Sequence, residues 1–160
     1  MMPYEPVLDI MRRTMANLEF VEQRASKDGP FEVTQLINSF LGAWAHPWEA
    51  LRDDLNSLSI ADVREQGWPI PSEERKSDQS PSNFGELIKL IRHSIAHGNI
   101  SFLPGTQGQI AALRIENWRS RRRTWGIIIN VPDMRAFLVK FVILVEDMAK
   151  STALRPRSIA

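Results

Sequence analysis

Four segments of the sequence carry apolar residues at the spacing of an amphipathic helix, and this pattern constrains the fold more than any other feature. The segments span residues 5–27, 31–45, 83–97 and 132–151. Apolar residues that recur every three or four positions form one stripe along a helix, and that stripe must be buried against a neighbouring element. With 160 residues and 43% hydrophobic content, the chain can build one domain with a sizeable core. The sequence therefore predicts a single, mainly α-helical domain over residues 1–151.

Proline and glycine mark where the helices should begin or stop. The sequence "DGP" at 28–30 ends the first helix. Pro47 closes the second, because the residue before a proline avoids helical geometry. Pro132 is suited to the first position of the last helix. Two weaker helical patterns, over 48–58 and 60–67, predict short additional helices.

The only β signal lies between the third and fourth helical segments. Residues 109–118 and 124–131 are strand-like, and the second run alternates apolar and other residues. The basic run "RSRRR" at 119–123 joins them, so we expect a two-stranded β-hairpin inserted before the last helix. An isolated hairpin is marginally stable in water, so its apolar side should pack on the helices.

Two further stretches lack any apolar period. Residues 68–82 are rich in proline, serine and charge, and we expect a mobile surface loop rather than a linker between domains. Residues 152–160 are expected to form a disordered tail. Neither stretch changes the prediction of one domain.

The composition excludes several classes of function. The chain has no cysteine, so disulfides, thiolate metal sites and cysteine nucleophiles are excluded. Charges interrupt the first residues before an apolar region forms, which argues against a signal peptide. No apolar run approaches the roughly 20 residues that span a bilayer. We therefore expect a cytoplasmic protein with no membrane partner, and the net charge of +1 leaves nucleic acid open as a partner.

The third helical segment carries an unusual group of polar residues, Arg92, His93 and His97. Asn83, with Glu86 three residues later, should cap its start, and glycine follows His97 at its end. Each residue turns a helix by about 100°, so the two histidines lie about 40° apart on one edge.

Three interpretations of this edge are open. Cationic side chains are favoured at the end of a helix, so the group could be partly exposed and structural. Histidines four residues apart can bind one metal ion, but no HExxH glutamate is present and His46 is the only other histidine. The third interpretation is phosphate chemistry: a histidine can take a proton from a ribose 2′-hydroxyl while an arginine holds the phosphate. Such RNA cleavage needs no metal or other cofactor.

The sequence "IRHSIAHGNISF" resembles the R-x4-H signature of the HEPN superfamily (higher eukaryotes and prokaryotes nucleotide-binding), in particular its small prokaryotic nucleases. The segments around it are similar to the same branch: "FEVTQLINSFLGAWAHPWE", "GWPI", and the stretch from "NISF" through "TWGIIINVPDMRAFLVKF". The resemblance covers residues 31–141. It implies a HEPN-like helical bundle that forms a homodimer through the motif helix.

The resemblance also implies roles for individual residues. Arg92 would stabilise the scissile phosphate and His97 would act as general base, giving a 2′,3′-cyclic phosphate and a 5′-hydroxyl. His93 stands where the family often has asparagine, so its orienting role stays open. Asn99 stands where some HEPN toxins have tyrosine; it can hydrogen-bond to substrate but cannot replace a phenol. A role as a toxin or defence protein, with an antitoxin partner, would follow from the same resemblance.

The basic run offers a second candidate surface for RNA. Arg119, Arg121, Arg122 and Arg123 could contact phosphates, or could equally form a solvated loop that keeps the hairpin soluble. Trp118 and Trp125 flank this run and are expected to pack across the strands rather than stack on bases.

Three functions remain consistent with the sequence: a metal-independent endoribonuclease, a non-catalytic HEPN module that binds RNA, nucleotide or protein, and a purely structural dimer. The first requires an open site around Arg92 and His97. The last predicts that both side chains are occupied by intramolecular partners.

Overall fold

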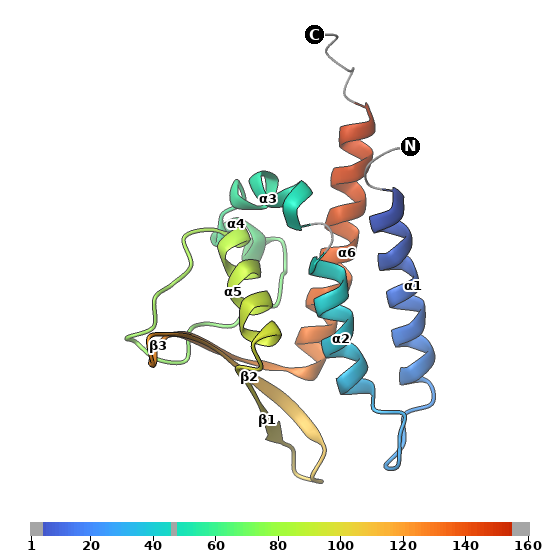
Figure 1. Cartoon of the computed structure of the whole chain (residues 1–160), viewed down its shortest axis with the longest axis vertical. Coiled ribbons are helices and arrows are strands. Elements are labelled where there is room, and N and C mark those ends of the chain that lie inside the picture. Colours follow the sequence, from blue (N-terminus) through green and yellow to red (C-terminus); the bar gives the residue numbers. More distant parts are fainter. Residues whose placement is uncertain (1–4, 46–47, 155–160) are drawn as a thin grey trace.

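The computed structural model describes residues 5–45 and 48–154 (Figure 1). Within these ranges the chain forms six helices and three strands, which confirms a mainly helical protein. They are α1 (Glu5–Glu22), α2 (Glu32–Ala45), α3 (Trp48–Asn56), α4 (Ile60–Glu65), α5 (Phe84–Ala96), β1 (Ile100–Pro104), β2 (Ile110–Arg119), β3 (Arg122–Asn130) and α6 (Val131–Leu154).

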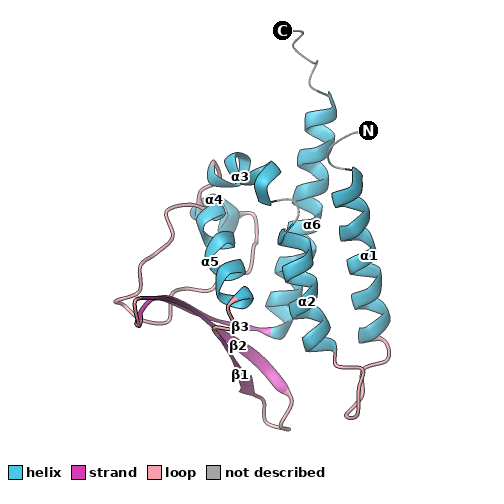
Figure 2. Cartoon of the chain, in the orientation of Figure 1, coloured by secondary structure: helices cyan, strands magenta, loops and turns pink. Residues whose placement is uncertain are grey.

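Three of the helices, α1, α2 and α6, form a helical layer, and a small sheet lies below α5 (Figure 2). α1, α2 and α6 run side by side, and α5 packs against α2, with α3 and α4 near the start of α5 (Figure 1). α2 is central, since it contacts α1, α5 and α6. The sheet lies across the lower end of α5 and meets it through β2.

A cluster of aromatic side chains joins α2, α5 and α6. Phe40 and Trp44 on α2 lie with ring centroids 4.5 Å apart, and both contact the ring of Phe137 on α6. Trp68 joins the cluster from the loop after α4, with its ring 4.8 Å from that of Phe84. Each aromatic side chain buries a large apolar area. This cluster therefore fixes α5 against the helical layer.

Several predicted boundaries differ from those observed. α1 ends at Glu22 rather than near residue 27, and the chain then turns through Gly29, whose φ is +102°. α6 continues to Leu154, past the expected start of the tail at residue 152. The remainder of that tail lies outside the described residues.

The sheet has three strands, so the prediction of a two-stranded hairpin was incomplete. The missed strand, β1, pairs antiparallel with β2 at the edge of the sheet. It is only five residues long and ends at Pro104, where the register shifts. Proline is tolerated on an edge strand, where its missing N–H is not needed for pairing. Because β1 is short and ends in proline, its sequence does not show the alternating apolar pattern that predicts a strand.

The hairpin of β2 and β3 turns more tightly than expected. Ser120 and Arg121 have φ values of +49° and +65° and form a two-residue connection. Such turns match the twist of antiparallel strands. Trp125 pairs with Asn117 and is buried, whereas Trp118 is 43% exposed. The expectation that the tryptophans pack across the strands therefore holds for the buried Trp125 and not for the exposed Trp118.

The segment 68–82 is a loop, as predicted, but it is fastened to the free edge of β3. The N–H of Glu74 donates to the carbonyl of Gly126, and the N–H of Gln79 donates to that of Thr124, each at 2.8 Å. These bonds protect an edge that would otherwise be open to other strands.

Arg123 joins this loop to the hairpin. Its side chain is only 4% exposed and lies within 2.9 Å of carboxylate oxygens of Glu74, Asp78 and Glu116. A Cβ atom at Gly126 would overlap the Arg123 guanidinium, so a glycine is needed there. The sequence left open whether Arg123 contacts RNA or lies in a solvated loop; in the structure its buried guanidinium pairs with carboxylates inside the protein.

We predict that Arg123→Ala lowers the free energy of unfolding by about 3–5 kcal/mol, because it leaves the buried carboxylate of Asp78 without a counter-charge. Urea unfolding followed by circular dichroism measures this change. Arg122→Ala is the matched control, since Arg122 is exposed, and should change stability by less than about 0.5 kcal/mol. Equal effects of the two substitutions would contradict the structural role of Arg123.

Candidate active site

The start of α5 is fixed by hydrogen bonds from side chains. Asn83 Oδ1 accepts from the N–H of Glu86 at 2.8 Å, which confirms the predicted N-cap. The Glu86 carboxylate accepts from both the N–H and the hydroxyl of Ser82 at 2.6 Å, rather than from Asn83. These bonds from Ser82 lower the pKa of Glu86. Glu86 is therefore an ionised carboxylate beside the first turn of the helix.

One side of α5 is buried and the other faces solvent. The buried residues are Phe84, Gly85, Leu87, Ile88, Ile91, Ser94 and Ile95. Ser94 is the polar member of this set, and its hydroxyl donates to the Leu90 carbonyl at 2.8 Å. His93 and His97 are exposed, and Arg92 is half-buried. The burial of the apolar stripe thus leaves the polar residues on an open edge.

A tight turn holds His97 and Asn99 in place at the end of α5. His97 is the C-cap residue of α5. Gly98 follows it with a φ of +69°, as predicted. The N–H of Asn99 donates to the Ser94 carbonyl at 2.8 Å. The Asn99 carbonyl then accepts from the N–H of Glu116 on β2 at 3.0 Å. The turn therefore positions His97 relative to both the helix and the sheet.

The rings of His93 and His97 are in contact, with centroids 4.3 Å apart. Partial burial of the His93 ring lowers its pKa, and the charges of His97, Lys89 and Arg92 add to this effect. His93 is therefore mostly neutral near pH 7. A neutral imidazole can accept a proton or a hydrogen bond at one nitrogen and donate at the other.

Within the described part of the chain, the side chains of Arg92 and His97 form no hydrogen bond and no ion pair. The ring of His97 does contact the ring of His93. A purely structural role predicted that intramolecular partners would occupy both. Within the described residues, that expectation is wrong. The two side chains are free to contact a ligand or a second protein chain.

The basic residues of the hairpin lie away from this edge. Arg119, Arg121 and Arg122 are exposed at the hairpin tip. Arg119 is three residues beyond Glu116 on β2, which places it about 10 Å along the strand from the point where Asn99 meets the sheet. The structure thus brings His93 and His97 into contact, places Arg92 and Asn99 on the same last turns of α5 and the turn that follows, and puts the basic tip at one side.

Lys89 lies on the same edge of α5 as His93, although it was not among the site residues predicted from the sequence. Its charge lowers the pKa of both Glu86, one turn before it, and His93, one turn after it. The spacing of four residues from Lys89 to His93 was the available signal, because residues four apart are neighbours on a helix.

Other kinds of site find little support in the described residues. Across 5–45 and 48–154, no three histidine or carboxylate side chains lie close enough to hold a metal ion. His46 falls outside these ranges. Over the same ranges, none of the helices is long and apolar enough to cross a membrane.

A mainly helical domain with an open Arg-x4-His edge agrees with the class of protein that the sequence resembles, the HEPN superfamily. The family described as HEPN pEK499 p136 matches residues 1–151, and the chain belongs to it. No curated protein and no solved structure matched the chain in the same comparisons.

We predict that His93 titrates below its ordinary value of 6.5, since its surroundings disfavour the charged form. Because the unfolded chain then binds the proton more readily, His93 lowers stability as the pH falls below 6.5. Lys89→Gln should move the His93 midpoint upward by removing one nearby positive charge. Imidazole proton NMR measures both values.

Lys150→Gln is the matched control for this titration, because Lys150 is exposed near the far end of α6. It should leave the His93 midpoint unchanged. A His93 midpoint at or above 6.5 in the unaltered protein would contradict the described environment.

Proposed function

We propose that this protein is an endoribonuclease of HEPN type that cleaves RNA by internal transfer, without a metal ion. The observation that carries this proposal is the open edge of α5, where Arg92 and His97 have no side-chain hydrogen-bond or ion-pair partner in the described part of the chain. Membership of the HEPN pEK499 p136 family supports it.

The proposed reaction uses the two groups in distinct roles. His97 takes the proton from a ribose 2′-hydroxyl, and the 2′-oxygen attacks the adjacent phosphorus. Arg92 stabilises the charge that develops on the phosphate oxygens. The bond to the 5′-oxygen breaks, and that oxygen takes up a proton. The products are a 2′,3′-cyclic phosphate and a 5′-hydroxyl, and a hydrogen bond from His93 to the phosphate or to the partner chain would assist the reaction.

A homodimer through α5 would complete this site. Arg92 and His97 are five residues apart, so they differ by about 140° around one helix and by roughly 7.5 Å along it. This separation makes simultaneous contact with one phosphate difficult from a single helix. Two copies related by a two-fold axis would bring Arg92 of one chain towards His97 of the other.

The exposed hairpin tip provides a surface for the rest of the RNA. Arg119, Arg121 and Arg122 can bind backbone phosphates, which gives affinity without sequence selection. Trp118 is exposed beside them and can stack on an unpaired base. Asn99 lies next to His97 and can hydrogen-bond to the substrate. A cytoplasmic toxin or defence protein, controlled by an antitoxin, is the biological role that this activity would fit.

A non-catalytic HEPN module that binds RNA, nucleotide or protein is the second candidate. His93 replaces the asparagine that often follows the motif arginine, and Asn99 replaces the tyrosine of some HEPN toxins. These two departures favour a protein that keeps the open edge of α5 for binding but has lost turnover.

We predict that the wild-type protein cleaves single-stranded RNA in EDTA and leaves 2′,3′-cyclic phosphate ends. Arg92→Ala and His97→Ala should each lower the rate at least about 100-fold, because each removes a group that acts in the transition state. Gel electrophoresis and mass spectrometry of the products measure the rate and the end groups.

Arg13→Ala is the matched control, since Arg13 is exposed on α1, away from α5 (Figure 1). It should retain full activity. Intact RNA with every protein, all of them folded, would favour the binding module over the nuclease.

We predict a dimer whose mass is twice the 18.3 kDa of one chain. Ala96 is exposed on the same side of α5 as the motif, so Ala96→Glu would place like charges near the two-fold axis and shift the protein to monomer. Sedimentation velocity measures the mass. Ala61→Glu, at an exposed position on α4, should stay dimeric. A wild-type monomer at concentrations that cleave RNA would exclude the shared site.

A further inference from the structure

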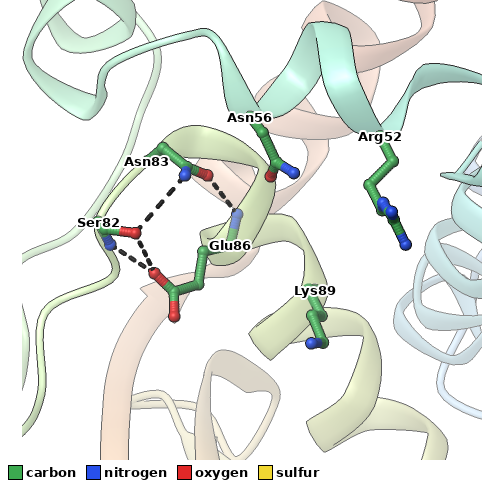
Figure 3. Close-up of a pocket in the computed structure, with 6 residues that line it drawn as sticks. All are labelled: Arg52, Asn56, Ser82, Asn83, Glu86 and Lys89. Carbon is green, nitrogen blue, oxygen red and sulfur yellow. Dashed lines mark hydrogen bonds between the residues drawn. The ribbon is translucent and has the colours of Figure 1, made fainter.

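A polar cavity of about 400 Å³ lies between α3 and the start of α5 (Figure 3). We call it the α3–α5 pocket, and its lining residues are Arg52, Asn56, Ser82, Asn83, Glu86 and Lys89. Arg52 and Asn56 come from α3, and the others come from the first turns of α5 and the residues just before it (Figure 3). A cavity of this volume is within the range of small-ligand sites.

Its walls are held in place by contacts among the lining elements. A Cβ atom at Gly85 would overlap the side chain of Asn56 and lie 2.9 Å from its backbone nitrogen, so α3 and α5 approach each other closely there. The N–H of Phe84 donates to the Leu58 carbonyl at 2.9 Å. Ser82 orients the Glu86 carboxylate. Ser82, Asn83 and Glu86 are therefore positioned before any ligand binds.

The two cations of the pocket are available for an anionic ligand. Among the described residues, Arg52 forms one ion pair, with Asp53 at 3.9 Å, and both side chains are largely exposed, so this pair is weak. Lys89 is exposed and forms no hydrogen bond or ion pair with the described residues. Asn56 and Asn83 add amide groups, and the Glu86 carboxylate can accept from hydroxyl or amino groups. A phosphate with an attached sugar or base matches this set.

The α3–α5 pocket lies on the same side of α5 as His93, which is one turn further along the helix than the lining residue Lys89. Lys89 lies four residues before His93, which corresponds to roughly 6 Å along the helix axis. The charge of Lys89 acts on Glu86 inside the pocket and on His93 at the motif. A chain of RNA that follows this side of α5 would pass from one to the other.

We propose that the α3–α5 pocket is a nucleotide subsite for the RNA chain whose scissile phosphate lies at Arg92 and His97. Arg52 and Lys89 hold a flanking phosphate, and the amide and carboxylate groups contact the sugar or base attached to it. This assignment rests on the proposed nuclease function, and it adds a group of residues that would influence which nucleotide is accepted beside the cleavage position.

Binding of a short, fluorescein-labelled single-stranded RNA of mixed sequence tests this assignment. The measurements use the His97→Ala protein, which should bind without cleaving, and compare it with the same protein carrying Arg52→Gln and Lys89→Gln. Loss of two phosphate contacts should weaken binding about tenfold at low salt. It should also reduce the slope of log affinity against log salt by about 1.4, at about 0.7 per contact with a single strand.

Arg13→Gln with Lys150→Gln is the matched control, since it removes the same two kinds of charge from exposed positions on α1 and α6. Its affinity should stay within about twofold, because distant exposed charges are screened at ordinary salt. Melting curves check that every variant is folded, which we expect because the substituted side chains are exposed.

Two results separate this proposal from the proposed function. Equal affinity and salt slope for the pocket variant and the control would overturn the subsite, even if the wild-type protein cleaves RNA. Weaker binding by the pocket variant alone would support the subsite, and it would do so even if the wild-type protein leaves RNA intact and the nuclease proposal fails.

Discussion

The packing of the apolar face of α5 is the interaction on which the rest of the site depends. Leu87, Ile88 and Ile91 are at most 3% exposed, and they fill the space between α2, α3 and β2. Burying one such side chain contributes about 1.5–3 kcal/mol. Turning the helix to bury His93 or His97 would expose several of them and cost about 5 kcal/mol or more. The direction of the polar edge is therefore set by the core and not by the polar residues themselves.

The end of the helix adds the second constraint. Gly98 adopts a left-handed conformation that side chains with a Cβ rarely take, and it lets Asn99 reach both Ser94 and Glu116. His97 is thus held at the junction of α5 and the sheet. A general base must be placed within hydrogen-bond reach of its proton, so rigidity at this junction suits the proposed chemistry.

The sequence predicted the elements whose signals are local. Helical spacing, the Asn83 cap and the glycine after His97 are read from neighbouring residues, and the structure agrees with them. The separate role of Arg123 could not be read in this way, because two of its partners, Glu74 and Asp78, lie more than 40 residues before it. In the sequence, nothing distinguishes Arg123 from the other arginines of the basic run.

The α3–α5 pocket illustrates the same limit. It exists because Gly85 allows α3 to approach α5, and this approach brings Arg52 and Lys89 to the lining of one cavity. Arg52 and Lys89 lie on different helices, and no regular spacing in the sequence predicts that they line the same cavity. The exposed position of Trp118 likewise depends on a register shift beside it on β2, and a strand pattern alone does not give the position of a bulge.

The most direct test of the account replaces one nucleotide at a mapped cleavage position with its 2′-deoxy form. If the 2′-hydroxyl is the nucleophile that His97 activates, cleavage at that position should stop, while binding and cleavage at other positions continue. Continued cleavage at the substituted position would show that water is the nucleophile, and it would contradict the mechanism assigned to Arg92 and His97.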